Sequence, residues 1–274
     1  MKSATIKIMM YMFLVTLFII CIIPFYLMLI NGTRSAADIN TGVTFIPGKY
    51  LIENFKTISS ELDFFTGLKN TAFICTAIMI ISSYVAGLTA FSIVFYDYRF
   101  KKTIFAIILG TLMIPQTLGL IGYFDLCVKL NILDTLMAIV FSGCANASSV
   151  FFLKQYTESV IPPAIIQAAR VDGASELGIY HRIGIPMMLP GMASIGIFAF
   201  VFNWNNYILP LTIISSEEKY TISMTIQKLN STVYFRDYGA VYLGIGLSII
   251  PIIIVFSIFS KAIIQGIAGG SVKE

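Results

Sequence analysis

The chain has 274 residues, of which 57% are apolar and only 12% are charged, about half the charged share of an ordinary soluble domain. A soluble fold of this size could not bury that much apolar surface, whereas a lipid bilayer accepts it. The net charge of +4 is modest and the basic residues form no run, so the composition gives no indication of nucleic-acid binding.

Six long runs without Asp, Glu, Lys or Arg follow one another along the chain. Each is long enough to cross the hydrocarbon layer as a helix. A single segment in lipid must be helical, because lipid cannot form hydrogen bonds with the backbone N–H and C=O groups. The first run is too long for the apolar part of a signal peptide, so no cleavage is expected. The sequence predicts an all-α integral membrane protein, one transmembrane domain over residues 1–274, with spans at about 8–30, 70–96, 103–124, 135–153, 187–213 and 238–260.

The positive-inside rule orients these spans. With a cytoplasmic N-terminus, ten Lys and Arg residues lie inside and eight outside, and the cluster Arg99–Lys102 falls in a tight inner loop. We therefore expect a multi-pass protein with both termini in the cytoplasm. This topology places a long inner loop at residues 154–186 and an outer loop at Glu217–Asp237.

The inner loop has the pattern of a helix, a turn and a second helix. Pro162-Pro163 favours a helix start, and Asp172-Gly173 favours a turn. The two helices are predicted at Ala164–Val171 and Ala174–Ile185. Small residues at the turn would let the backbone of a partner approach closely. These residues alone fit insertion into a partner's groove and a linker helix at the membrane interface equally well.

The same loop resembles the signature of permease subunits of type I ABC importers. The family pattern is roughly E-A-A-x-x-D-G-A and then I-x-L-P-x-x-x-P, and this chain has Gln167–Ala174 and Ile183–Pro190 at the matching spacing. Gln167 stands where the pattern has Glu, so a charge-assisted hydrogen bond becomes a neutral one. The resemblance implies a coupling helix that docks in a cleft of the ATPase through Gln167, Ala168, Ala169, Asp172, Gly173 and Ala174.

Further motifs resemble the second permease of maltose-type carbohydrate importers. Leu130–Thr135 is similar to the family's L-G-L-x-D-T turn, Asn203–Leu211 to its W-N-x-F-x-x-P-L motif, and Gly266–Glu274 to its G-L-x-x-G-A-V-K-G ending. The resemblance covers nearly the whole chain and implies import of a sugar or an oligosaccharide across a bacterial cell membrane. The partners it implies are two ATPase subunits that hold ATP and magnesium, a second homologous permease and an extracytoplasmic solute-binding protein. It places the tail residues Gly269, Gly270 and Lys273 at the ATPase.

A cluster of five residues with polar side-chain groups interrupts the fifth apolar run. Amides without partners are costly in lipid, so these side chains should face the bundle or a water-filled path. A sugar pathway would use amides for hydroxyl groups and aromatic faces for sugar rings. Helix–helix hydrogen bonding and an aromatic belt at the outer interface are the alternatives. The candidate pathway residues are Asn203, Trp204, Asn205, Asn206 and Tyr207.

The outer loop mixes polar and aromatic side chains. In the maltose-type permeases that the chain resembles, the corresponding loop reaches into the open binding protein. A solvated connector is the alternative interpretation. The expected contact residues are Thr221, Ser223, Thr225, Gln227 and Asn230.

The sequence also bears on other classes of function. It contains no G-x-x-x-x-G-K-[ST] motif, so ATP must be hydrolysed by another polypeptide and no catalytic residue is expected. His181 stands alone, and no metal ligand set is expected. A permease of the same superfamily for a polyamine, phosphate or an amino acid would share the inner loop. A secondary transporter would show intramembrane charges or inverted halves, and a membrane enzyme would need clustered His, Asp or Glu, so both are disfavoured.

Overall fold

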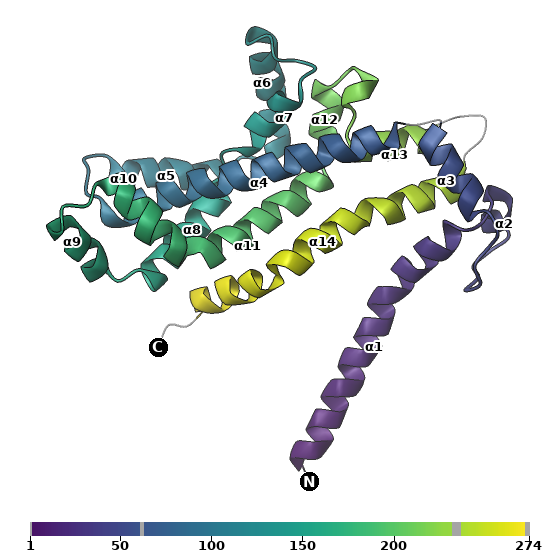
Figure 1. The fold of residues 1–274 in the computed structure, drawn as a ribbon, viewed down its shortest axis with the longest axis horizontal. Coiled ribbons are helices and arrows are strands. Elements are labelled where there is room, and N and C mark those ends of the chain that lie inside the picture. The colour runs from purple at the N-terminus through teal and green to yellow at the C-terminus, as the bar shows by residue number, and fades with distance from the viewer. Residues whose placement is uncertain (1, 61–62, 232–236, 272–274) are drawn as a thin grey trace. The chain divides into compact units, whose positions relative to one another are not determined.

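The computed structural model describes residues 2–60, 63–231 and 237–271, and over these residues the protein is all-helical (Figure 1). The N-terminal helices are α1 (Lys2–Asn31), α2 (Ala36–Asn40), α3 (Leu51–Ser60) and α4 (Phe64–Phe95). The middle helices are α5 (Lys101–Thr111), α6 (Gln116–Lys129), α7 (Leu136–Gly143), α8 (Ala147–Val160), α9 (Pro163–Val171), α10 (Glu176–Ile179) and the π-helical segment η1 (Tyr180–Gly184). The last are α11 (Ile185–Trp204), α12 (Ile208–Ile213), the 3-10 segment η2 (Glu217–Lys219), α13 (Ile222–Ser231) and α14 (Tyr238–Ser271).

Long apolar helices account for most of the predicted spans. Among the described residues, four helical runs are long and apolar enough to cross a membrane: Ile6–Asn31, Phe64–Phe95, Glu176–Trp204 and Tyr238–Lys261. The pair α7 and α8, bent by 43° at a short break, adds a fifth if it acts as one span. The predicted all-α, multi-pass membrane character is thus confirmed, whereas the number of six spans stays a prediction.

The predicted span 103–124 is not one helix. Helix α5 ends at Thr111, and Pro115 stands at the N-cap of α6 with a non-helical ψ of 128°. Proline has no N–H to continue a preceding helix, and it disfavours the helical conformation at the residue before it. The proline therefore divides a run whose apolar length alone predicted a continuous helix.

The predicted span 187–213 is divided as well. Helix α11 ends at Trp204, and α12 is a separate short helix. Pro210 lies in the first turn of α12, where a missing N–H is harmless, but it could not continue a helix that came from α11. Asn206 occupies the break, and its side-chain oxygen accepts from the Leu209 N–H at 3.4 Å.

The chain forms two compact units. Unit 1 comprises Met1–Leu68 and Met224–Ile250, and unit 2 comprises Lys69–Ser223 and Pro251–Glu274. Unit 2 carries the inner loop, the polar group of the fifth run and the start of the outer loop.

Buried polar side chains organise unit 1 in the segment that follows α1. Asn54 of α3 is buried, and its amide donates to the carbonyls of Gly32 at 2.9 Å and Arg34 at 3.0 Å. The Arg34 guanidinium donates to the carbonyl of Gly42 at 3.0 Å and to that of Asp38. Buried polar groups are stable only with such partners, so this network fixes the path between α1 and α3.

The main core of unit 2 is built from α4, α8, α9, η1 and α11. Its most buried large side chains, each at 1% exposure or less, are Phe91, Leu153, Ile161, Ile166, Ile179, Tyr180 and Met188. Helix α11 packs along α8 (Figure 1). Because the core includes α9 and the first turn of α11, it holds the inner loop directly.

Candidate functional site

Helix α9 anchors the inner loop by one face. Ile166 is 1% exposed in the core of unit 2, and Ala169 packs against the same core. Gln167 and Ala168 are exposed. The helix therefore holds one face in protein and presents small and polar side chains on the other, at the positions that the sequence predicted for partner contact.

The predicted turn after α9 forms at Gly173. Its φ of +78° lies in the left-handed region that favours glycine. The N–H of Gly173 donates to the Arg170 carbonyl at 3.1 Å, and that of Ala174 donates to the Ala169 carbonyl at 3.0 Å. This pair of bonds is the Schellman motif that commonly ends a helix.

Arg170 and Glu176 join the two sides of the turn. Arg170 Nε donates to Glu176 Oε1 at 2.9 Å, and Nη2 donates to the Phe95 carbonyl at the end of α4 at 3.3 Å. The Tyr96 hydroxyl donates to Glu176 Oε2 at 2.6 Å. The hydrogen bond with Glu176 raises the pKa of Arg170. An exposed ion pair alone contributes less than about 1 kcal/mol, so the joint contact with the end of α4 is what positions the loop.

The second helix of the loop begins at Glu176 and not, as predicted, at Ala174. Ser175 is its N-cap, because the Ser175 hydroxyl accepts from the Gly178 N–H at 3.2 Å. The chain then passes through η1 before α11 begins. Turns of π-helix occur often at functional sites, and the apolar periodicity of this segment did not indicate one.

The tip of the inner loop is exposed. Asp172, Gly173 and Ala174 all lie at the surface, between Val171 at 88% exposure and Leu177 at 62%. Apart from Gly173 itself and its chain neighbours, no atom of the described residues lies within 4 Å of the point where a Cβ on Gly173 would stand. This surface of small and apolar groups can enter a groove on another protein.

His181 lies in η1 and contacts α4. Its ring nitrogens lie 2.7 Å from the Leu177 carbonyl oxygen and 3.1 Å from the Tyr84 hydroxyl oxygen. Both nitrogens therefore have partners within the fold. Among the described residues, no group of three or more His, Cys, Asp or Glu side chains could hold a metal ion.

Most amides of the candidate pathway turn back on their own backbone. Asn203 Nδ2 donates to the Ala199 carbonyl at 2.8 Å, and Asn205 Nδ2 donates to the Val201 carbonyl at 2.8 Å. Asn205 is exposed, whereas Asn203 is half-buried. Hydrogen bonds within one helix leave both amide oxygens able to accept from a ligand.

Trp204 is the buried member of this group, at 3% exposure. Its ring stacks on Phe200 with centroids 5.3 Å apart. Its indole N–H is buried and has no acceptor among the described residues. Buried donors normally have partners, so this N–H is an uncommitted group in the middle of the candidate pathway. Tyr207 is half-buried in the break that follows.

The outer loop contains a helix that the sequence analysis did not predict. Ile222 and Leu229 of α13 are both buried and lie two turns apart on the same face, a helical spacing that could have indicated the helix. Thr221 and Thr225 are each 4% exposed, whereas Gln227 is exposed. Of the proposed contact residues, the side chain of Asn230 and the surroundings of Gly269 and Gly270 are not described, and Lys273 lies outside the described residues.

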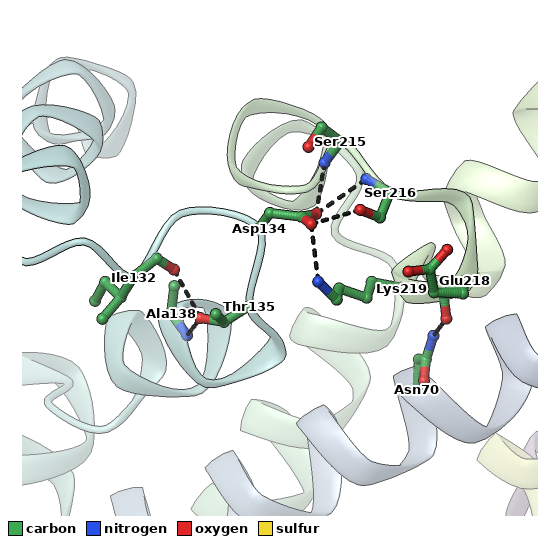
Figure 2. Close-up of polar contacts among 9 residues, drawn as sticks. All are labelled: Asn70, Ile132, Asp134, Thr135, Ala138, Ser215, Ser216, Glu218 and Lys219. Atoms are coloured by element: carbon green, nitrogen blue, oxygen red, sulfur yellow. Dashed lines mark hydrogen bonds and ion pairs between the residues drawn. The ribbon is translucent and has the colours of Figure 1, made fainter.

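Asp134 is the functional candidate that sequence reasoning missed. Figure 2 shows its carboxylate facing the segment after α12, where it accepts from the backbone N–H groups of Ser215 and Ser216, each at 2.9 Å. It also accepts from the Ser216 hydroxyl and, at 2.8 Å, from Lys219 Nζ. The available signal is its place in the Leu130–Thr135 turn, which resembles the L-G-L-x-D-T turn of the family.

No protein-family model matches the chain. It is 31% identical to the lactose transport system permease protein LacG of Rhizobium radiobacter, over 92% of this chain and 91% of that protein. It is 28% identical to the arabinooligosaccharides transport system permease protein AraQ of Halalkalibacterium halodurans, over 93% and 92%. The crystal structure of a bacterial ABC transporter that imports the acidic polysaccharide alginate matches in fold, with a TM-score of 0.82, 24% identity, and 95% and 98% coverage.

Proposed function

This chain belongs to the permease proteins of carbohydrate ABC transport systems, and from this membership we propose that it forms the membrane path of an ATP-driven importer of a sugar or an oligosaccharide. The relatives named for lactose and arabinooligosaccharide transport support a carbohydrate as the solute. Since the sequence has no phosphate-binding loop, ATP and magnesium bind on two ATPase subunits. A second homologous permease and an extracytoplasmic solute-binding protein complete the assembly.

The proposed topology has six spans and two cytoplasmic termini. The bent pair α7 and α8 supplies one span, and the divided pair α5 and α6 supplies another. The Arg99–Lys102 cluster supports the orientation. A cysteine at Ser216 should react with an impermeant thiol reagent from outside the cell, and one at Ser175 should not. The reverse labelling would overturn this orientation.

The inner loop is the proposed coupling site for the ATPase. One observation carries this proposal: α9 is anchored in the core by Ile166, while its tip leaves Ala168, Asp172 and Gly173 exposed. Arg170 ties the same loop to the end of α4. A push on the tip therefore reaches α4 directly and α11 through η1.

Ala168→Trp tests the coupling proposal, because this helical position is exposed and needs no unusual backbone angle. We expect loss of sugar uptake and loss of ATPase co-purification, with normal membrane insertion. Gln155→Trp, at an exposed position of α8, is the matched control and should retain both. Gln167→Ala should weaken docking by only about 0.5–1.5 kcal/mol, since it removes one neutral hydrogen bond. Normal uptake in Ala168→Trp would remove the loop from the mechanism.

The group Asn203–Tyr207 is proposed to line the sugar pathway. The exposed amide of Asn205 and the uncommitted N–H of Trp204 support this role. Trp204→Phe keeps an aromatic ring that can stack on Phe200 and removes the N–H donor together with one ring of the indole. It should raise the half-saturating sugar concentration for uptake by about threefold or more, the effect of losing one hydrogen bond to a ligand. An unchanged half-saturating concentration would exclude a sugar contact by this N–H.

The outer loop is proposed to contact the solute-binding protein, and the C-terminal tail to contact the ATPase. Gln227 supports the first role as an exposed polar side chain of α13. Gln227→Ala should reduce uptake at limiting binding protein and leave uptake at saturating binding protein unchanged. Deletion of the last six residues should lower ATPase co-purification and leave insertion intact. Wild-type behaviour in either variant would remove that contact from the proposal.

A further inference from the structure

The connector Ser215–Thr221, between α12 and α13, is held from two sides. On one side, Asn70 of α4 donates from Nδ2 to the carbonyls of Glu218 and Tyr220, each at 3.0 Å. Thr71 then accepts from the Ile222 N–H at 2.8 Å, at the start of α13. On the other side lies the Asp134 carboxylate (Figure 2). The connector is thus hydrogen-bonded on one side to the start of α4 and on the other to the turn between α6 and α7.

Asp134 binds this region with its backbone as well as its side chain. Its N–H donates to the carbonyl of Ile213, the last residue of α12, at 2.9 Å. Its φ of +55° and the +54° of Asn131 lie in the left-handed region, which Asp and Asn tolerate better than other residues with a Cβ. The turn between α6 and α7 therefore has an uncommon backbone conformation at Asn131 and Asp134. In this conformation the backbone N–H of Asp134 reaches the end of α12, and its carboxylate reaches the connector.

The bonds to backbone N–H groups carry more of this contact than the ion pair does. The side chains of Lys219 and Asp134 are 36% and 25% exposed, so water weakens their attraction. The N–H groups of Ser215 and Ser216 are directional donors that an oxygen at this point satisfies. An Asn side chain could keep one such oxygen, whereas Ala could keep none.

We propose that Asp134 is a positioning residue for the binding-protein side of the transporter, fixing the connector to the turn between α6 and α7. The connector leads to Ser223, whose hydroxyl donates to the Trp204 carbonyl at 3.2 Å. Asp134 thereby links the connector, on which the binding protein would dock, to the end of α11, where the candidate pathway begins. A binding protein that presses on the connector moves α12 and the turn with it. This inference rests on the proposed function, in which a solute-binding protein docks on this side.

Asp134→Ala and Asp134→Asn test the proposal, with Asp125→Ala as the matched control. Asp125 is exposed on α6, and its carboxylate makes no hydrogen bond or ion pair within the described part of the chain. The intact transporter is purified through a tag on this chain and reconstituted in liposomes. The probe is the sugar-loaded solute-binding protein that stimulates the wild-type complex. ATPase rates are measured against its concentration, and hydrogen exchange is followed at the Ser215 and Ser216 amides.

Asp134→Ala should raise the half-saturating concentration of binding protein by about tenfold, equivalent to the loss of one charge-assisted hydrogen bond. Asp134→Asn should raise it by about threefold, since it keeps one acceptor oxygen. The ATPase rate without binding protein should stay within about twofold in all variants, because a local loosening leaves the inner loop untouched. Exchange at the two serine amides should accelerate in Asp134→Ala and stay at the wild-type rate in Asp125→Ala.

Wild-type half-saturation in Asp134→Ala, or unchanged exchange at both serines, would overturn the proposal. If Asp134→Ala does not accumulate, Asp134→Asn decides by the same two readouts. A wild-type complex that no sugar-loaded binding protein stimulates would instead overturn the proposed function. The exchange measurement separates the two failures, because it tests the clamp on the connector without any partner.

Discussion

Gly239, at the start of α14, lies so close to the carbonyl oxygen of Arg34 that a Cβ at this position would overlap that atom. The same Cβ would lie 2.5 Å from Asn54 Nδ2, which donates to that carbonyl. The bare backbone of Gly239 is therefore what allows α14 to meet the polar network of unit 1.

Gly239→Ala should destabilise the protein by about 1–3 kcal/mol or more, because the clash is with backbone and with a buried amide that cannot move freely. Gly244→Ala, on the same helix, is the control, since its nearest atoms would lie 3.6 Å or farther away. Thermal unfolding of the purified protein in lipid nanodiscs measures the difference. Equal midpoints for the two variants would contradict the close approach seen here.

Gly173→Ala should loosen the turn of the inner loop without any clash. Its φ of +78° costs a residue with a Cβ about 1 kcal/mol, and the space around it is open. Hydrogen exchange at the Ala174 amide should accelerate by about fivefold, the equivalent of that energy. Gly110→Ala in α5 is also uncrowded, but a helical position there should make alanine neutral or stabilising. If exchange at the Ala174 amide accelerated in Gly110→Ala as much as in Gly173→Ala, the effect would not be specific to the turn, and the prediction would be wrong.

Trp204→Phe should lower the free energy of unfolding by about 1–2 kcal/mol, because the smaller ring leaves a small cavity at a buried site. The lost N–H should add little, since it has no acceptor among the described residues. The stack on Phe200 would remain. Trp204→Ala should cost about 3–5 kcal/mol, because it empties a buried site. Unfolding midpoints of the two variants in nanodiscs give the comparison. A loss in Trp204→Phe as large as in Trp204→Ala would mean that the N–H bonds to a group within the folded assembly.

The stabilising effect of Asp134 should depend on pH. Hydrogen bonds from Lys219, from the Ser216 hydroxyl and from two backbone N–H groups hold the pKa of Asp134 well below its ordinary value. A lowered folded-state pKa stabilises the protein above the unfolded-state pKa of about 4, and this stabilisation is lost as the pH falls below that value.

Asp134→Asn should therefore unfold more readily than the wild type at pH 7, by on the order of 1 kcal/mol after screening by solvent. The difference in unfolding free energy between the wild type and Asp134→Asn should persist at pH 5 and become smaller below about pH 4. Asp125→Asn, at an exposed position of α6, is the control at pH 7 and should unfold at the wild-type midpoint there. Midpoints measured at pH 7, 5 and 3.5 test the sign, and a gap that widens on acidification would contradict it.

Local patterns in the sequence determined the membrane character and much of the inner loop. Apolar length predicted long helices because lipid forces each backbone group to pair within a few residues. Asp172-Gly173 predicted a turn because only the backbone angle at one residue was at issue. The prolines at 115 and 210 carry local signals as well, because proline cannot continue a preceding helix.

The tertiary structure alone decided which distant groups meet. Asp134 bonds to residues 81 to 85 positions later, and Tyr96 bonds to Glu176 across 80 positions. Thr221 and Thr225 were predicted as contact residues for their polarity, yet packing buries both. A single sequence states the chemistry of each side chain, whereas its neighbours follow from how helices pack, and packing depends on shape over the whole fold and not on any local period.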